Sequence, residues 1–424
     1  MTPALALPRA TLVVRHALVA TCDAGAHDAG LVADGAVAVA DRLVAWVGPD
    51  RHLAGAVDAA GAEEIDAGGR LVTPGLVDSH THLVFAGERA REHAARCAGA
   101  SYLDVARAGG GIASTVRATA AATDGELLAG ALARAERLLA QGVTTVEVKS
   151  GYGLEVEAEL RLLGVVEALR HALWSRLTVV PTLLALHALP AGADRARHVA
   201  RVRDELVPAA AERRLAVACD AFLEEGAFTA AECREVLSAA ARAGLATHLH
   251  ADQLTPGGGA RLAAELGCAS ADHLERVDEA GVAALAAAGV VAGLLPTSTL
   301  FLRLAAFAPA RRLLDAGAAV SLATNVNPGS AMSETPALTL GLACAALGLT
   351  PAEALVAFTA GGARALRRAD VGRLAPGCEA DLVLWGCRDL EHLPWHLGVP
   401  HALRVVKRGR TVHQAAPGAA ADCA

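Results

Sequence analysis

Short apolar runs alternate with amphipathic stretches through the middle of the chain. Eight of these runs have the length and the Val, Leu and Ala content of buried strands. They are 71–77, 143–148, 177–184, 215–222, 245–249, 269–272, 290–295 and 320–323. Helical patterns lie between them, for example at 126–141, 157–173, 230–243 and 277–288. Eight strand–helix units in succession predict an α/β fold, a (β/α)8 TIM-like barrel.

Both ends of the chain have a different pattern from the middle. Residues 11–73 and 372–413 consist of short β-type runs broken by Gly and Asp. The simplest arrangement is one small β-sandwich domain built from both termini, around an inserted barrel. We therefore predict a composite β-sandwich domain at 1–73 and 366–424, and a (β/α)8 barrel at 74–365.

The composition of the chain bears on its cellular compartment and on the kinds of partner it binds. The chain has 38 Lys and Arg against 45 Asp and Glu, and the two signs are interspersed, so neither a nucleic-acid nor an anionic-membrane surface is expected. It contains no secretory signal pattern and no apolar run of about 18 residues. The nine cysteines are scattered without a Cys-x-x-Cys pair, which favours reduced thiols in a cytoplasmic protein. A homodimer is expected from base rates alone.

The first barrel strand, 71–77, runs directly into a His-x-His pair, His80 and His82. Side chains alternate in an extended chain, so both imidazoles leave on the same side and can close on one ion. The alternative is a pair of polar residues where a strand passes into a loop. The ends of the other strands discriminate between these two interpretations.

Polar side chains follow nearly every predicted barrel strand. In chain order they are Glu147 and Lys149 with Tyr152, then His187, Glu224 and Glu225, His248 to Gln253, Asp272 and His273, Thr297, and Asn325 to Ser330. The strand bodies themselves are apolar. Because the carboxyl ends of barrel strands meet on one face, which carries the active site, this clustering favours a metal site there.

A mononuclear Zn²⁺ or Fe²⁺ centre needs about three nitrogen or carboxylate ligands and a water molecule. His80, His82 and one histidine of the 245–249 strand end would supply the three. His248 and His250 lie on the same face of that strand, so spacing does not choose between them. His273 would serve as a fourth ligand or proton shuttle, or would have a structural role.

Two further residues suit a substrate. Arg89 follows the His-x-His segment closely, and an arginine in an active-site loop can bind a carboxylate with its fork of donors, although such residues are often simply solvated. His187 suits a substrate contact and a loop hydrogen bond about equally. The glycine run 109–111 lacks the spacing of a nucleotide-binding loop, and we interpret it as a loop over the barrel mouth.

The motifs along the chain resemble a known family. TPGLVDSHTHLVF resembles the opening strand of the amidohydrolase superfamily, in which a metal-bearing barrel accompanies a β-sandwich built from both termini. More narrowly, LVFAGERARE, GGGIASTV, TTVEVKSGYGL, LHALP, HLHADQ, SADHLE, LLPTSTLFLR and NPG resemble the imidazolonepropionase family. These matches run in order from about residue 70 to 375.

The resemblance implies a ligand set and a reaction. The histidine before Ala-Asp is the family's strand-end ligand, so one divalent metal, zinc or iron, would be held by His80, His82 and His250, with Asn325 at a fourth position. The family hydrolyses the ring C–N bond of 4-imidazolone-5-propanoate to N-formimidoyl-L-glutamate in histidine degradation, with water activated by the metal. The matching substrate-binding positions are Arg89, Tyr152, His187, Gln253, Asn327, Gly329 and Ser330. The catalytic positions are His273, Gln253 and Asn325.

Asn325 departs from the family pattern, which usually has an aspartate there. An amide oxygen can coordinate a metal weakly, but it carries no charge and cannot take a proton from water. His273 or a chain of water molecules could then act as the base. The departure leaves two alternatives open: a divergent hydrolase of another cyclic amide or imine, and a weak or silent paralogue that binds such ligands without turning them over.

Overall fold

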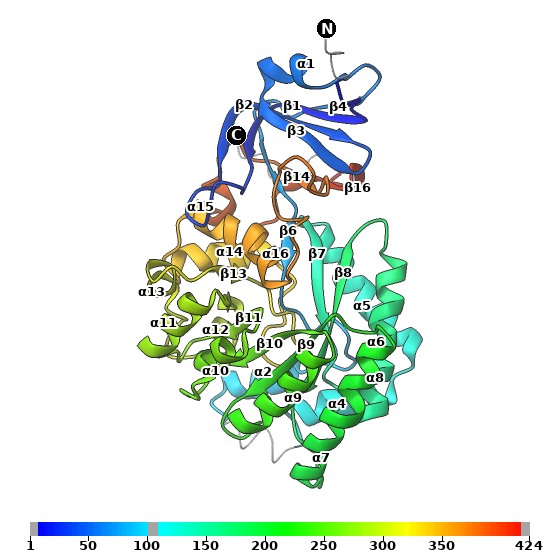
Figure 1. Cartoon of the computed structure of the whole chain (residues 1–424), viewed down its shortest axis with the longest axis vertical. Helices are drawn as coiled ribbons and strands as arrows, with labels where there is room; N and C mark the ends of the chain where they lie inside the picture. The colour runs from blue at the N-terminus through cyan, green and yellow to red at the C-terminus, as the bar shows by residue number, and fades with distance from the viewer. Residues whose placement is uncertain (1–6, 101–108, 417–424) are drawn as a thin grey trace.

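The computed structural model describes residues 7–100 and 109–416. Within them, two sheets of eight strands each divide the chain. Strands from the two chain ends, blue and red in Figure 1, lie together at the top of the view, and the barrel lies below them. The ends of the predicted terminal domain, residues 1–6 and 417–424, fall outside the described residues.

The barrel sheet contains eight strands in sequential order, and neighbouring strands are parallel throughout. The strands are β6 (Leu76–Asp78), β7 (Val143–Lys149), β8 (Thr178–Leu186), β9 (Ala218–Leu223), β10 (Ala246–Ala251), β11 (Ser270–His273), β12 (Val291–Leu294) and β13 (Val320–Leu322). This arrangement confirms the predicted (β/α)8 fold class. The predicted strands coincide with the observed ones to within a few residues, with one exception.

The exception is the run 71–77, which is two strands and not one. β5 (Leu71–Pro74) belongs to the terminal sheet, and β6 belongs to the barrel. Gly75 separates them: its N–H donates to the Asp381 carbonyl at 3.0 Å. A Cβ at this position would lie 2.1 Å from Thr144 Oγ1, so only glycine allows the chain to pass this close to β7. Apolar content alone could not reveal the change of sheet.

The seam between β6 and β13 is closed just beyond the two strands. The Asn325 N–H donates to the His80 carbonyl at 3.1 Å, and the His82 N–H donates to the Val326 carbonyl at 3.0 Å. Below them the Asp78 carboxylate accepts the Thr324 N–H at 3.0 Å and the Thr324 hydroxyl at 2.6 Å. The barrel is therefore closed by the same segments that carry the candidate site residues.

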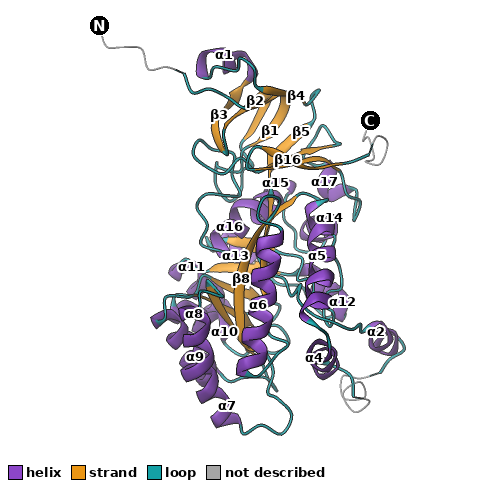
Figure 2. Ribbon diagram, turned by 90° about the vertical axis from the view of Figure 1, so that its right-hand side faces the viewer, coloured by secondary structure: helices purple, strands orange, loops and turns teal. Residues whose placement is uncertain are grey.

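Helices surround the barrel strands, as Figure 2 shows. They are α2 (Ala90–Cys97), α4 (Ile112–Ala121), α5 (Asp124–Leu139), α6 (Val156–Ala172), α7 (Arg195–Arg201), η2 (Val202–Leu206), α8 (Val207–Glu212), α9 (Ala230–Arg242), α10 (Gly259–Leu266), α11 (Glu279–Ala288), α12 (Pro296–Leu302), α13 (Ala310–Asp315), α14 (Pro336–Ala345), α15 (Pro351–Val356), η3 (Ala357–Gly361) and α16 (Gly362–Ala365). Helices α5, α9 and α15 each begin with a Thr and Glu capping box, which satisfies N–H groups of the first turn. No helix in the described ranges is long and apolar enough to cross a membrane.

The terminal sheet joins the two ends of the chain. Its strands are β1 (Leu12–Ala20), β2 (Leu31–Ala40), β3 (Leu43–Pro49), β4 (Glu63–Asp66), β5, β14 (Leu382–Trp385), β15 (Ala402–Lys407) and β16 (Arg410–Gln414), accompanied by η1 (Asp50–His52), α1 (Leu53–Ala56) and α17 (His392–Trp395). The antiparallel pair β5 and β14 connects the N-terminal strands to the C-terminal ones. A compact apolar core, including Val14, Val37 and Val406, lies in this sheet. The domain limits at 73/74 and 365/366 stay predictions.

Candidate metal centre and substrate site

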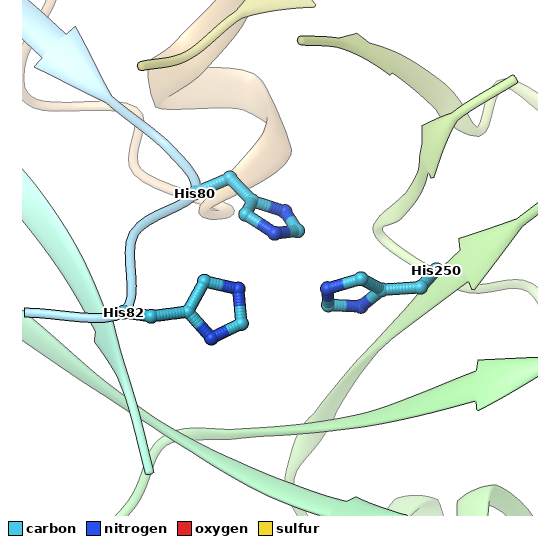
Figure 3. A group of neighbouring side chains, drawn as sticks. All are labelled: His80, His82 and His250. Carbon is cyan, nitrogen blue, oxygen red and sulfur yellow. The ribbon is translucent and has the colours of Figure 1, made fainter. Parts of the chain in front are cut away.

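Three buried imidazoles converge at the carboxyl ends of β6 and β10. His80 and His82 follow β6 in an extended segment, and His250 lies near the end of β10. One ring nitrogen from each lies within 4.8 Å of the others, and Figure 3 shows the rings turned toward a common centre. Burial lowers the pKa of all three, so each ring is neutral near pH 7 and keeps a lone pair for a cation.

Carboxylates hold two of the three rings. His80 Nδ1 lies 2.7 Å from Asp272 Oδ2, and His250 Nδ1 lies 3.0 Å from Asp220 Oδ2. In each case the other nitrogen, Nε2, is left for a ligand, as in carboxylate–histidine–metal sites. His80 Nε2 and both nitrogens of His82 are buried and have no hydrogen-bond partner in the described part of the chain. Buried unpartnered nitrogens are costly without a cation, so these residues fit a divalent metal ion.

The alternative ligand His248 has a different environment. Its Nδ1 lies 2.8 Å from Ser270 Oγ. Its side chain lines a cavity of about 960 Å³ together with residues at the amino ends of β8 and β9. The cluster of three imidazoles contains His250 and not His248. The geometry therefore favours His250 over His248, and its role as a metal ligand stays a prediction.

Asn325 lies in the segment that follows β13, and its backbone N–H donates to the His80 carbonyl. Its backbone has φ of 59°, a left-handed conformation that asparagine tolerates better than most residues. Its Nδ2 donates to Ser330 Oγ at 3.3 Å, and its Oδ1 is buried with no partner among the described residues. A buried neutral amide oxygen without a partner therefore stands at a position where a carboxylate would add a charge. Coordination by Asn325 stays a prediction.

Aromatic rings extend the site from His82. The His187 ring stacks on His82 with centroids 5.6 Å apart, and the Tyr152 ring lies 5.3 Å from His187. His187 Nδ1 lies 2.7 Å from the Gly151 carbonyl, so Nδ1 is the protonated nitrogen and Nε2 is an acceptor. Burial lowers the pKa of His187 to about 4, which keeps the ring neutral. The arrangement offers flat surfaces to a planar ligand.

Arg89 and the 327–330 segment meet on another side of the site. The Arg89 Nε donates to Glu92 Oε2 at 2.8 Å, which orients the guanidinium. A Cβ on Gly329 would lie 2.2 Å from an Arg89 terminal nitrogen, so glycine is needed for this approach. The Gly329 N–H donates to Asn327 Oδ1 at 2.8 Å, which fixes the turn. The structure thus brings Arg89, Asn327 and Gly329 together.

The two remaining candidates follow β10 and β11. The His273 ring lies 5.3 Å from the His250 ring and 5.7 Å from the His80 ring, which is close enough for a role in proton transfer. Gln253 is buried three residues after His250. Across residues 7–100 and 109–416, no hydrogen bond joins its side chain to the other candidates. Roles for Gln253 and His273 stay predictions.

Sequence reasoning missed Asp220 and gave no role to Glu147, Lys149 or Asp272. Asp220 lies inside the predicted strand 215–222 and is followed by two more of its residues, so the sequence pattern did not single it out as a strand-end residue. An aspartate within an apolar strand was the available signal, since buried acids are almost always paired.

Comparisons with known proteins agree with this geometry. The amidohydrolase family model matches residues 71–414. An imidazolonepropionase from Anaeromyxobacter dehalogenans is 65% identical over 98% of this chain and 99% of its own length. The chain belongs to the amidohydrolase family, in its imidazolonepropionase branch. This amidohydrolase also resembles imidazolonepropionases from Myxococcus xanthus, at 53% identity over 88% of the chain and 89% of the relative, and from Geobacillus kaustophilus, at 43% over 91% of each.

Solved structures share the fold of this amidohydrolase. A 5-methylcytosine deaminase from Klebsiella pneumoniae superposes with a TM-score of 0.74 at 18% identity, over 95% of this chain and 98% of that one. A zinc-bound adenosine deaminase from Xanthomonas campestris has a TM-score of 0.70 at 22% identity, over 96% and 93%. At these sequence identities the comparison shows a shared fold, which is the barrel with its terminal sheet.

Proposed function

We propose that this hydrolase opens the ring of 4-imidazolone-5-propanoate, yielding N-formimidoyl-L-glutamate, with the aid of one divalent metal ion. The 65% identity to an imidazolonepropionase supports this assignment. The observation that carries it is the joint presence, at the carboxyl ends of the strands, of the three-imidazole cluster, an oriented arginine and a stack of rings.

Arg89, Tyr152 and His187 would bind the substrate. The propanoate tail is a carboxylate, and Arg89 keeps its terminal N–H groups for it while Glu92 fixes the Nε end. The planar imidazolone ring suits the surfaces of Tyr152 and His187, and His187 Nε2 can accept a ring N–H. Gln253, Asn327, Gly329 and Ser330 would complete the polar wall around it.

His80, His82 and His250 would hold the ion, with Asn325 Oδ1 as a weak fourth ligand. Zinc and iron both suit such a nitrogen-rich set, and we propose one or the other. When bound, the ion supplies Lewis acidity: it polarises the ring carbonyl and lowers the pKa of a water molecule.

His273 would carry the proton that the reaction has to move. Water adds to the ring carbonyl carbon, the C–N bond breaks, and the leaving nitrogen gains a proton. We assign His273 as the group that accepts a proton from water and returns it to that nitrogen, because its ring lies next to the cluster. Gln253 would orient the water or the substrate, and Asn325 cannot act as a base.

The decisive experiment is an assay of the metal-loaded protein that follows the loss of imidazolonepropanoate, with Asn325→Asp alongside. We expect turnover by the natural chain, and an increase by Asn325→Asp of up to the roughly 10²- to 10⁴-fold that a general base contributes. Absence of turnover by both forms, with metal demonstrably bound, would refute the proposal.

Arg89→Ala tests the carboxylate contact. Losing a charge-assisted hydrogen bond costs about 1.5–3 kcal/mol, so KM should rise roughly 10- to 100-fold while kcat changes little. Arg91→Ala is the matched control, since Arg91 is an exposed arginine in α2, the helix that begins directly after Arg89. An unchanged KM for Arg89→Ala would remove Arg89 from the substrate site.

Asn325 also favours a second candidate, a hydrolase of another cyclic amide or imine, or a silent binding protein. The same assay separates them: turnover of a different cyclic amide supports the first, and binding of imidazolonepropanoate without turnover supports the second.

We further propose a cytoplasmic homodimer. The eight cysteines among the described residues are free thiols, which agrees with a reducing compartment. Sedimentation equilibrium would measure the oligomer.

A further inference from the structure

Lys149 is a fully buried cation at the carboxyl end of β7. Its Nζ lies 2.7 Å from Glu147 Oε1 and 2.8 Å from Asp220 Oδ2, and all three side chains are inaccessible to solvent. Lysine is almost never fully buried unless it is paired, because removing the charge from water is costly. Lys149 is not part of the imidazole cluster, so the ligand set alone does not account for it.

Glu147 connects Lys149 to the first two imidazoles. The second oxygen, Glu147 Oε2, accepts the Thr81 N–H at 3.1 Å, and the Thr81 hydroxyl donates to the Glu147 carbonyl at 2.5 Å. The Lys149 N–H in turn donates to the Thr81 carbonyl at 3.0 Å. Thr81 is the residue between His80 and His82. Three contacts with β7 therefore fix the backbone from which both imidazoles project.

Asp220 connects Lys149 to the third imidazole. The oxygen that Lys149 contacts, Oδ2, is the one that lies 3.0 Å from His250 Nδ1. The other oxygen accepts the Ala221 N–H at 2.7 Å, which limits rotation of the carboxylate. Asp220 therefore has one orientation in which it contacts both Lys149 and His250.

We propose that Lys149 is a positioning residue that couples the two halves of the metal-binding set. An unbroken path runs from Thr81 through Glu147, Lys149 and Asp220 to His250, and it joins three barrel strands to the His-x-His segment. Lys149 never touches the ion. Its role is to hold Asp220 and Thr81 at a fixed separation, so that the histidines present their nitrogens together. The inference rests on the metal role proposed above and not on the identity of the substrate.

The test measures Zn²⁺ affinity of the metal-free full-length protein by competition with a chromophoric chelator. Lys149→Met removes the charge at similar length, and we expect the Zn²⁺ Kd to rise about 10- to 100-fold, as for other residues that orient metal ligands. Lys407→Met is the matched control, since Lys407 is an equally buried lysine between two carboxylates in the terminal sheet. The Zn²⁺ Kd of Lys407→Met should stay within about twofold of the Kd of the natural chain.

Co²⁺ absorption gives a second reading of the ligand geometry. The visible spectrum should change in Lys149→Met and remain unchanged in Lys407→Met. A Zn²⁺ Kd and a Co²⁺ spectrum like those of the natural chain in folded Lys149→Met would overturn the proposal, as would an equal rise of the Zn²⁺ Kd in Lys407→Met.

If Lys149→Met does not fold, the Zn²⁺ Kd of Asp220→Asn is the test, because this change interrupts the path at His250 while Glu147 still pairs with Lys149. An unchanged Kd there refutes the coupling. Failure of the natural chain to bind either ion would refute the metal proposal itself.

Discussion

The barrel and the terminal sheet each bury one lysine between two carboxylates. In the barrel, Lys149 contacts Glu147 and Asp220 at 2.7 and 2.8 Å. In the terminal sheet, Lys407 contacts Glu379 and Asp381 at 3.1 and 2.6 Å. Both lysine side chains are completely buried. By charge and burial alone the two arrangements are nearly the same.

They differ in what lies beyond the carboxylates. Asp220 continues to His250, whereas Glu379 continues to the Arg408 guanidinium at 3.0 Å and Asp381 to the Arg408 N–H at 3.0 Å. Arg408 in turn donates to the Trp174 carbonyl at 2.9 Å, so the Lys407 group ties the terminal sheet to the barrel. A buried ion group is thus not in itself evidence of a functional site. The barrel group is distinguished by its contact with His250, which we propose as a metal ligand.

The largest expected effect is on stability, and it should be similar in both regions. Lys149→Met and Lys407→Met each remove the lysine cation that two buried carboxylates share, so we expect each to cost about 3–5 kcal/mol of unfolding free energy. Urea unfolding of the metal-free proteins measures this without a contribution from bound ion. A loss of unfolding free energy below about 1 kcal/mol in only one of the two variants would show that the two buried lysines are not equivalent for stability.

Metal removal should separate the two regions. With free Zn²⁺ at 100 times its Kd, stripping the ion from the natural chain should cost about 2.7 kcal/mol. Lys407→Met should lose the same amount. In Lys149→Met, a 10- to 100-fold weaker site leaves an ion-dependent contribution of only about 0.4–1.4 kcal/mol. Thermal unfolding with and without chelator measures the difference, and equal losses in both variants would contradict it.

The smallest expected effect is on the unfolding free energy at low pH. Burial alone would raise the pKa of Glu379, but Lys407 and Arg408 outweigh it and lower that pKa below its usual range. The folded state therefore binds this proton less readily than the unfolded state. The resulting stability is complete above the unfolded pKa of about 4.3 and is lost as pH falls through the lower folded value.

Glu379→Gln should consequently remove part of the acid sensitivity. The natural chain and the variant should differ most in unfolding free energy near pH 6 and progressively less below about pH 4.3. Glu391→Gln, at an exposed glutamate, is the control and should differ little at any pH. A difference between the natural chain and Glu379→Gln that stays constant from pH 6 to pH 3 would contradict the expectation.

Local pattern was sufficient for the barrel and for the two histidines after its first strand. Short segments of sequence are enough to recognise apolar runs of strand length and the i, i+2 spacing of His80 and His82. No tertiary information is needed for either. Choosing His250 over His248 needed either a family motif or the three-dimensional cluster. Asp220 was missed because its partners, Lys149 and His250, come from other strands. The junction at Gly75 was missed because both flanking strands are equally apolar.

The closure of the barrel seam bears on the order in which the protein forms. His80 and His82 hydrogen-bond through their backbones to Asn325 and Val326, which lie more than 240 positions later in the chain. On the ribosome the first two imidazoles and the β7 contacts of Thr81 are made early, but the segment that pairs with His80 and His82 at the seam emerges after all the other barrel strands. If these imidazoles hold the proposed ion, its capture at full affinity would be a late event that coincides with completion of the barrel.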